Sequence, residues 1–122
     1  MLVLSACHTA IGDKDAELGF AGLAVLAGAR SAMGSLWYVD DAGTLGLMTT
    51  FYEQLKEAPV KAEALRRAQL EMLRKNVRLE DGQLITSAGE NIILPESMEH
   101  ITGKDLSHPY YWAAFTMIGN PW

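Results

Sequence analysis

Cysteine and positive charge are both scarce in this chain. Its 122 residues include a single cysteine, Cys7, so no internal disulfide can form. A lone thiol is typical of proteins in reducing compartments and predicts a cytoplasmic location. Lysine and arginine number 10 against 15 aspartates and glutamates, which gives a net charge of −5. Because nucleic-acid binders usually present a basic face, this balance argues against a nucleic acid as partner.

Long apolar runs and clusters of metal ligands are also missing. No run approaches the roughly 20 apolar residues that span a bilayer, and no basic segment precedes the first apolar one, so we expect neither a membrane span nor a signal peptide. The three histidines and the cysteine lack metal-ligand spacing, and we expect no metal and no other cofactor. The remaining composition, 49% hydrophobic and 20% charged, is that of a single globular domain with a buried core.

The first third of the sequence alternates short apolar runs with a helical pattern. Residues 2–6 predict a buried strand, residues 19–29 a buried helix rich in small side chains, and residues 31–36 a second strand. This order indicates an α/β layer fold with crossover helices. A parallel strand needs neighbours on both sides, so a chain that opens in such a strand is expected to lack an upstream part of its sheet.

Two longer helices are predicted in the middle of the chain. The first covers residues 42–57, with Asp40 or Asp41 as its N-cap, and Pro59 ends it. The second covers residues 60–77 and is the clearest amphipathic pattern. The first has an expected apolar stripe of Leu45, Met48, Tyr52 and Leu55, widened by Leu47 and Phe51. The second has expected core residues Leu65, Ala68, Met72 and Leu73, and expected ion pairs Glu63–Arg67 and Glu71–Lys75.

The pattern changes after the second helix. Asp81-Gly82 between two apolar runs predicts a hairpin turn, and Ala88-Gly89 marks a second break. We interpret residues 78–107 as a loosely attached hairpin or loop excursion from the single domain of residues 1–122. The aromatic-rich segment 110–119 predicts a final strand.

Cys7 stands at the predicted carboxyl edge of the first strand, where ligands bind in open α/β sheets. A thiol there is a candidate nucleophile, and the alternative is a small buried hydrophobe, which is common for free cysteine. His8 is badly placed as a base because neighbouring residues of an extended strand point to opposite faces. His108, before Pro109, is expected to hydrogen-bond a loop, and His100 is expected to be exposed.

Five segments occur in order along the chain: LSACHTAIG, GFAGLAVLAGARSAMGSLWYVDDAGT, LMTTFYEQL, ALRRAQLEML and HPYYWAAFTMIGN. Together they resemble the C-terminal half of a CHAT domain. CHAT domains are caspase-like cysteine peptidase domains related to separase and often found beside tetratricopeptide repeats. The resemblance implies a caspase-like three-layer sandwich with a mainly parallel sheet, present here as an incomplete C-terminal half.

The resemblance also implies the roles of particular residues. Cys7 matches the catalytic nucleophile, and Thr44 matches a family threonine. The family's catalytic histidine lies upstream in a His-Gly motif that this sequence lacks, and the glycine beside it forms the oxyanion hole together with the N–H of the nucleophile. The implied substrate pocket lies between the nucleophile strand and residues 35–41. Its candidate residues are Ser5, Ser35, Trp37 and Asp41.

Two of these pocket residues have an alternative interpretation. Asp41 is either a helix cap or a pocket carboxylate that favours a basic P1 side chain through a charge-assisted contact. Trp37 either walls the pocket or fills the core. The sequence alone leaves both choices open.

Two functions follow. The first is the nucleophile-bearing part of a CHAT-type cysteine endopeptidase, which hydrolyses peptide bonds through a Cys7 thioester and is inactive alone because the upstream histidine is missing. The alternative is a non-catalytic caspase-like module for protein interaction and assembly. The expected partners are a protein or peptide substrate, a tetratricopeptide-repeat protein or a polypeptide carrying the other CHAT half, and further copies of the chain that pair through exposed strand edges.

Overall fold

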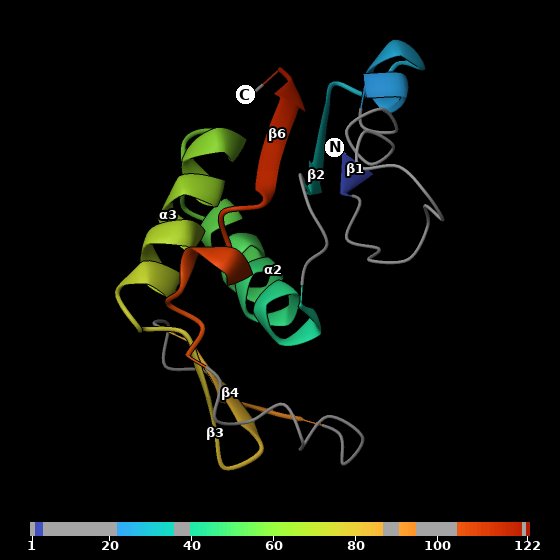
Figure 1. Cartoon of the computed structure of the whole chain (residues 1–122). Coiled ribbons are helices and arrows are strands. Elements are labelled where there is room, and N and C mark those ends of the chain that lie inside the picture. Colours follow the sequence, from blue (N-terminus) through green and yellow to red (C-terminus); the bar gives the residue numbers. More distant parts are fainter. Residues whose placement is uncertain (1, 4–21, 36–39, 87–90, 95–104, 121) are drawn as a thin grey trace.

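The computed structural model describes residues 2–3, 22–35, 40–86, 91–94, 105–120 and 122. They form both helices and strands, as Figure 1 shows, which confirms the predicted mixed α/β class. Residues 22–26 are helical. The labelled elements are β1 (Leu2–Val3), β2 (Ser31–Ser35), α2 (Asp41–Leu55), α3 (Lys61–Leu73), β3 (Arg78–Glu80), β4 (Gln83–Ile85), β5 (Asn91–Ile93), the 3-10 helix η2 (Pro109–Tyr111) and β6 (Phe115–Gly119).

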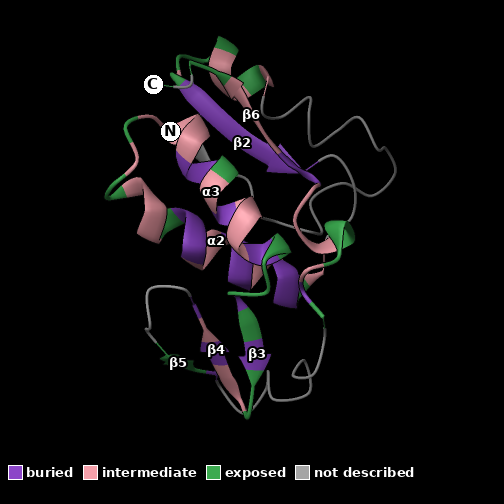
Figure 2. Cartoon of the chain, turned by 90° about the vertical axis from the view of Figure 1, so that its left-hand side faces the viewer, coloured by how far each residue is buried: buried purple, intermediate pink, exposed green. Residues whose placement is uncertain are grey.

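Strand β2 is the centre of the first sheet, whose strand order is β1-β2-β6. β1 runs parallel to β2 with Val3 opposite Met33, and β6 runs antiparallel with Phe115 opposite Ser35. Figures 1 and 2 place helical residues 22–26 on one side of this sheet and α2 with α3 on the other. Since β2 has a strand on each edge and helices on each face, all of its residues are buried.

The described strands do not form the mainly parallel sheet that the sequence analysis expects. The pair β1–β2 is parallel, whereas β2–β6 and the pairs β3–β4 and β4–β5 of a second sheet are antiparallel. The final strand is also shorter than predicted. Pro109, with its fixed φ, opens η2 and His108 caps it, so the chain turns before it enters the sheet at Phe115.

Helix α2 buries a different line of side chains from the predicted one. Leu47 and Phe51 are fully buried, whereas Tyr52 is 50% exposed. The residues Leu45, Met48 and Leu55 are only partly buried and pack at the border of the core. The predicted stripe was therefore centred wrongly, because both flanks of α2 carry apolar side chains and the position of α3 and the sheets decides which flank faces inward.

Helix α3 buries Leu65, Ala68 and Met72 as predicted, but Leu73 is 48% exposed. The helix ends at Leu73 instead of near Val77, and Lys75 adopts the left-handed region with φ 62°. This early end explains the Leu73 error. The side chain of Leu73 lies on the last turn, where no further helix packs around it.

The early end of α3 also changes the ion pairs. The predicted pair of Glu63 and Arg67 forms, with 3.0 Å between oxygen and nitrogen. The predicted partner of Glu71 was Lys75, but Lys75 has left the helix and its Nζ lies 3.9 Å from Asp105. Instead, Oε1 of Glu71 lies 3.8 Å from Nη1 of Arg74.

The predicted hairpin forms between β3 and β4. Asp81 and Gly82 make its turn with φ 49° and φ 70°, the left-handed values that a tight two-residue turn requires. Ala88-Gly89 lies outside the described residues. The segment is not loosely attached, because the side chains that it turns inward join the main core. These are Leu79, Leu84, Leu94 and Leu106.

The core is a single apolar cluster that joins the first sheet, both helices and the hairpin. Figure 2 shows buried residues on β2, on the inner sides of α2 and α3, and on β3 and β4. The side chain of Gln69 ties α3 to the end of the chain, because it donates hydrogen bonds to the carbonyl oxygens of Trp112 and Phe115, at 3.1 and 3.3 Å. Over the described ranges, no helix has the length and apolarity to cross a bilayer.

Candidate functional site

The candidate site lies at the edge of the first sheet where β1 and β2 end. Because the two strands run parallel, with Val3 opposite Met33, their carboxyl ends point to the same edge. Ligands of open α/β sheets bind at this edge. Ser35, the last residue of β2, is buried there, and α2 starts soon afterwards at Asp41.

Asp40 and Asp41 have different tasks at the start of α2. The Asp40 carboxylate accepts hydrogen bonds from the backbone N–H groups of Ala42 and Gly43, at 2.9 and 3.3 Å. Asp40 is therefore the N-cap, which confirms one of the two predicted candidates. Asp41 is the first residue of the helix and is exposed, so its carboxylate is not used for capping.

Thr44 adds an unsatisfied polar group in the first turn of α2. Its backbone N–H bonds to the Asp40 carbonyl at 2.9 Å, as helix geometry requires. Its hydroxyl oxygen is buried and has no hydrogen-bond partner in the described part of the chain. A buried polar atom without a partner costs about 1–3 kcal/mol, and a bound water is the ordinary way in which proteins satisfy such an atom.

The 3-10 helix η2 packs against the same turn of α2. A Cβ atom added at Gly43 would lie 2.8 Å from Cβ of Tyr111 and 2.9 Å from its carbonyl oxygen. The two segments therefore approach to backbone distance, and only glycine fits between them. The sequence analysis missed this contact, since nothing in the spacing of the two segments indicates that they meet.

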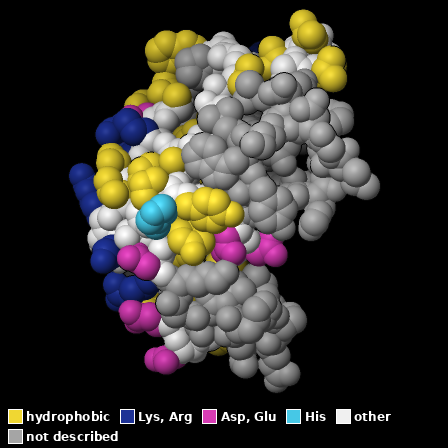
Figure 3. Space-filling view, in the orientation of Figure 1, with side chains coloured by type: hydrophobic (Ala, Val, Ile, Leu, Met, Phe, Trp, Pro, Cys, Tyr) yellow, Lys and Arg dark blue, Asp and Glu magenta, His cyan; other side chains and the backbone are white. Residues whose placement is uncertain are grey.

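A hollow of about 430 Å³ opens beside η2, lined by Asp105, His108, Tyr110 and Tyr111. Nδ1 of His108 accepts a hydrogen bond from the Tyr110 N–H at 3.1 Å, which confirms the predicted loop-stabilising role. The Ser107 hydroxyl and then its backbone N–H donate to the Asp105 carboxylate and lower its pKa below the usual value. Figure 3 shows the histidine beside a group of hydrophobic side chains on this face.

The remaining predicted site residues fall outside the described part of the chain. These are Ser5, Cys7 and Trp37, and the same holds for His8 and His100. The structure thus describes Ser35 at the end of β2 and Asp41 at the start of α2, and the positions of the other three stay predictions. Among the described residues, no group of three or more His, Cys, Asp or Glu side chains is arranged to hold a metal ion.

Comparison with known proteins gives one match. The family model described as CHAT domain matches residues 1–120, nearly the full printed sequence. No curated protein and no solved structure matches the chain.

Proposed function

The chain belongs to the CHAT domain family, and from that premise we propose that it carries the nucleophile of a cysteine endopeptidase. The observation that carries the proposal is the family match, which covers residues 1–120 and so includes Cys7. Cys7 follows Val3, the last residue of β1, by four residues in the sequence.

The proposed reaction is acyl transfer through a thioester. The Cys7 thiolate attacks the carbonyl carbon of a peptide bond, the C–N bond breaks, and the amine leaves with a proton. Water then attacks the thioester carbonyl, releases the acid product and restores the thiol. The base is a histidine from a His-Gly motif outside the printed sequence, which contains no His-Gly pair. Without that histidine we expect no peptide hydrolysis.

A mainly parallel caspase-like sandwich is part of this proposal. The parallel pair β1–β2 and the helices on both faces of its sheet support that architecture. The antiparallel strand β6 then closes one side of the sheet, and further parallel strands would be added beside β1. Those strands and the His-Gly motif would come from the same missing part.

The proposed substrate pocket contains Ser5, Ser35, Trp37 and Asp41. Two described features support it. Ser35 is buried at the end of β2, and the carboxylate of Asp41 is exposed because Asp40, not Asp41, caps the helix. A carboxylate in that position favours an arginine or lysine at P1 through a charge-assisted contact.

The alternative proposal is a non-catalytic module for assembly, as a second copy or with a tetratricopeptide-repeat protein. One described feature favours it. Strand β5 lies at an edge of the second sheet, with Ile93 78% exposed. An uncharged, apolar edge strand of this kind is a template for pairing with another chain.

Alkylation of the sole cysteine tests the two functions. Mass spectrometry of the protein treated with iodoacetamide follows Cys7 alone, and Cys7→Ser is the blank. With the histidine-bearing polypeptide present, a catalytic thiolate reaches its full alkylation rate below about pH 7, whereas the alkylation rate of an ordinary thiol rises with a pKa of about 8.5.

Cleavage of fluorogenic peptides with arginine or glutamate at P1 is measured in the same protein, supplied with the histidine-bearing polypeptide. Asp41→Asn should reduce cleavage after arginine only. An ordinary thiol with no cleavage would reject the peptidase in favour of the assembly module.

A further inference from the structure

A second hollow, separate from the candidate site, lies on the outer surface between α2 and α3. It has a volume of about 340 Å³ and is lined by Gln54 of α2 and by Arg66, Arg67, Leu70, Glu71 and Arg74 of α3. Gln54 stands thirteen residues after Asp41 on the same helix, which places the groove about 20 Å along α2 from its start. We call it the arginine groove.

The arginine groove is positively charged although the chain is acidic. Three arginines line it, whereas the whole chain has a net charge of −5. Figure 3 shows basic side chains gathered along the left edge of the molecule. A local positive site on a negative protein attracts an anionic segment to one place and repels it elsewhere.

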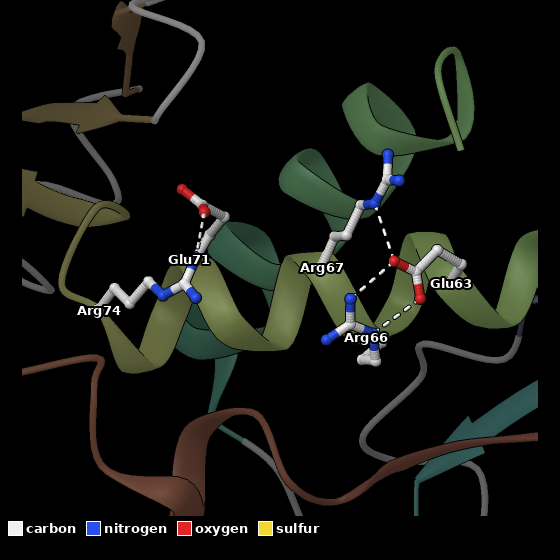
Figure 4. Close-up of polar contacts among 5 residues, drawn as sticks. All are labelled: Glu63, Arg66, Arg67, Glu71 and Arg74. Atoms are coloured by element: carbon white, nitrogen blue, oxygen red, sulfur yellow. Dashed lines mark hydrogen bonds and ion pairs between the residues drawn. The ribbon is translucent and has the colours of Figure 1, made fainter. Parts of the chain in front are cut away.

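The ion pairs of α3 leave Arg67 and Arg74 with the most donors to offer. Arg66 already uses two of its five N–H donors, because its Nε and Nη2 both lie 2.7 Å from the Glu63 carboxylate. Arg67 donates only its Nε, at 3.0 Å, to the same carboxylate. Hydrogen bonds from Arg66 and Arg67 lower the pKa of Glu63 from 4.5 to about 2, so Glu63 stays ionised. Figure 4 shows Glu63 between these two arginines.

Arg74 is the second available group. Its Nη1 lies 3.8 Å from Glu71, too far for a hydrogen bond, and its side chain is 63% exposed. Glu71 itself accepts a hydrogen bond from the Asn76 side chain at 3.0 Å. Gln54 adds an amide donor, because its side chain makes no hydrogen bond within the described residues.

The spacing of these donors defines a ligand. Arg67 and Arg74 are seven residues apart on one helix, which is about 10 Å along its axis. On a peptide in the polyproline II conformation, which has three residues per turn, carboxylates three residues apart lie on the same face and about 9 Å apart. Leu70 lies between the two arginines and offers an apolar contact to a residue between the two acids.

We infer that the arginine groove binds an acidic segment of a partner protein in the polyproline II conformation, in which two carboxylates three residues apart flank an apolar residue. Arg67 and Arg74 each bind one carboxylate through their terminal nitrogens, and Leu70 contacts the apolar side chain. This recognition does not involve Cys7 and is independent of the proposed peptidase activity.

Fluorescence anisotropy with a short labelled peptide tests the inference on the full chain. The peptide carries two glutamates three residues apart with a leucine between them, and its control replaces both glutamates by glutamine. Arg67→Gln and Arg74→Gln should each weaken binding of the acidic peptide about fivefold, and added salt should weaken it further. Arg78→Gln, whose guanidinium pairs with Glu80 at 2.9 Å outside the groove, should leave binding unchanged.

Several outcomes would overturn the inference. Equal binding of the glutamate and glutamine peptides would exclude charge recognition, and unchanged binding by Arg67→Gln and Arg74→Gln would place the site elsewhere. Displacement of the peptide by inorganic phosphate at equal concentration would identify a phosphate site instead. Circular dichroism melts show that each variant is folded. Arg74→Lys keeps the positive charge but loses the forked pair of N–H donors, so its affinity for the acidic peptide should lie between those of wild type and Arg74→Gln.

Discussion

Replacement of Gly43 by alanine tests the close approach of α2 and η2. The new Cβ would lie 2.8 Å from Cβ of Tyr111 and 2.9 Å from the Tyr111 carbonyl oxygen, whereas carbon atoms pack best at about 3.5–4.0 Å. Backbone has to move, and overpacking of this kind costs about 1–3 kcal/mol. Alanine regains up to about 1 kcal/mol of helix propensity. Because the nearest atoms include a backbone oxygen, we take the upper end of the overpacking cost, about 3 kcal/mol. The net loss of unfolding free energy is then about 2 kcal/mol.

The loss should appear as a lower melting temperature. With an unfolding entropy of about 2.1 cal/mol/K per residue, 2 kcal/mol corresponds to a decrease of about 8 °C in a thermal melt followed by circular dichroism. Gly46→Ala is the matched control in the same helix. Its Cβ would meet side-chain atoms that can rotate, with Val77 Cγ1 the nearest at 3.1 Å, so we expect a change near zero. Equal melting temperatures for the two variants would refute the proposed contact.

Three further predictions concern the helix cap, the ion pairs and the hairpin. Asp40→Ala removes the cap of α2 and should lower the unfolding free energy by about 1 kcal/mol in urea, whereas Asp41→Ala should change it little. The pKa of Glu63 is lowered from 4.5 to about 2, so its ion pairs stabilise the fold above that window and the stabilisation is lost as the pH falls through it. Urea titrations between pH 5 and pH 2 should therefore show a shallower loss for Glu63→Gln than for wild type, and parallel curves would contradict the assignment. Leu84→Ala should cost about 2–5 kcal/mol because its side chain is fully buried in β4, whereas Ile93→Ala on exposed β5 should stay within about 0.5 kcal/mol.

Local features of the fold could be predicted from the sequence. The start of α2 follows from Asp40, because a capping carboxylate acts on residues two and three places later. The β3–β4 turn follows from Asp81-Gly82, since few residue pairs tolerate two left-handed positions. Both signals act over a few residues and need no knowledge of the rest of the molecule.

Long-range features could not be predicted in the same way. The direction of β6 depends on how η2 turns the chain, and the inward flank of α2 depends on where α3 packs. Apolar periodicity is the same for either flank of α2, so Tyr52 was assigned to the core although it is half exposed. The end of α3 was misplaced because Lys75 carries no helix-breaking signal, yet adopts a left-handed conformation.

Some features of the candidate site could likewise be identified from the sequence, and others could not. Ser35 and Asp41 were identified through the family resemblance, and the structure places Ser35 at the end of β2 and Asp41 at the start of α2. Cys7 was identified through spaced motifs, and its position remains a prediction. The Tyr111–Gly43 contact and the arginine groove escaped notice because each joins side chains from segments that are distant in the sequence.

The pairing of β2 with β6 has a consequence for how the molecule is made. Ser31 pairs with Gly119 and Ser35 with Phe115, so the first sheet joins segments from opposite ends of the described chain. During synthesis, β2 leaves the ribosome long before β6. Until β6 is made, one edge of β2 is unpaired, and its residues, which are buried in the folded chain, are exposed. Contacts of such high sequence separation also slow folding. Until the segment around Phe115 has emerged, the growing chain therefore carries an open strand edge that can pair with another chain.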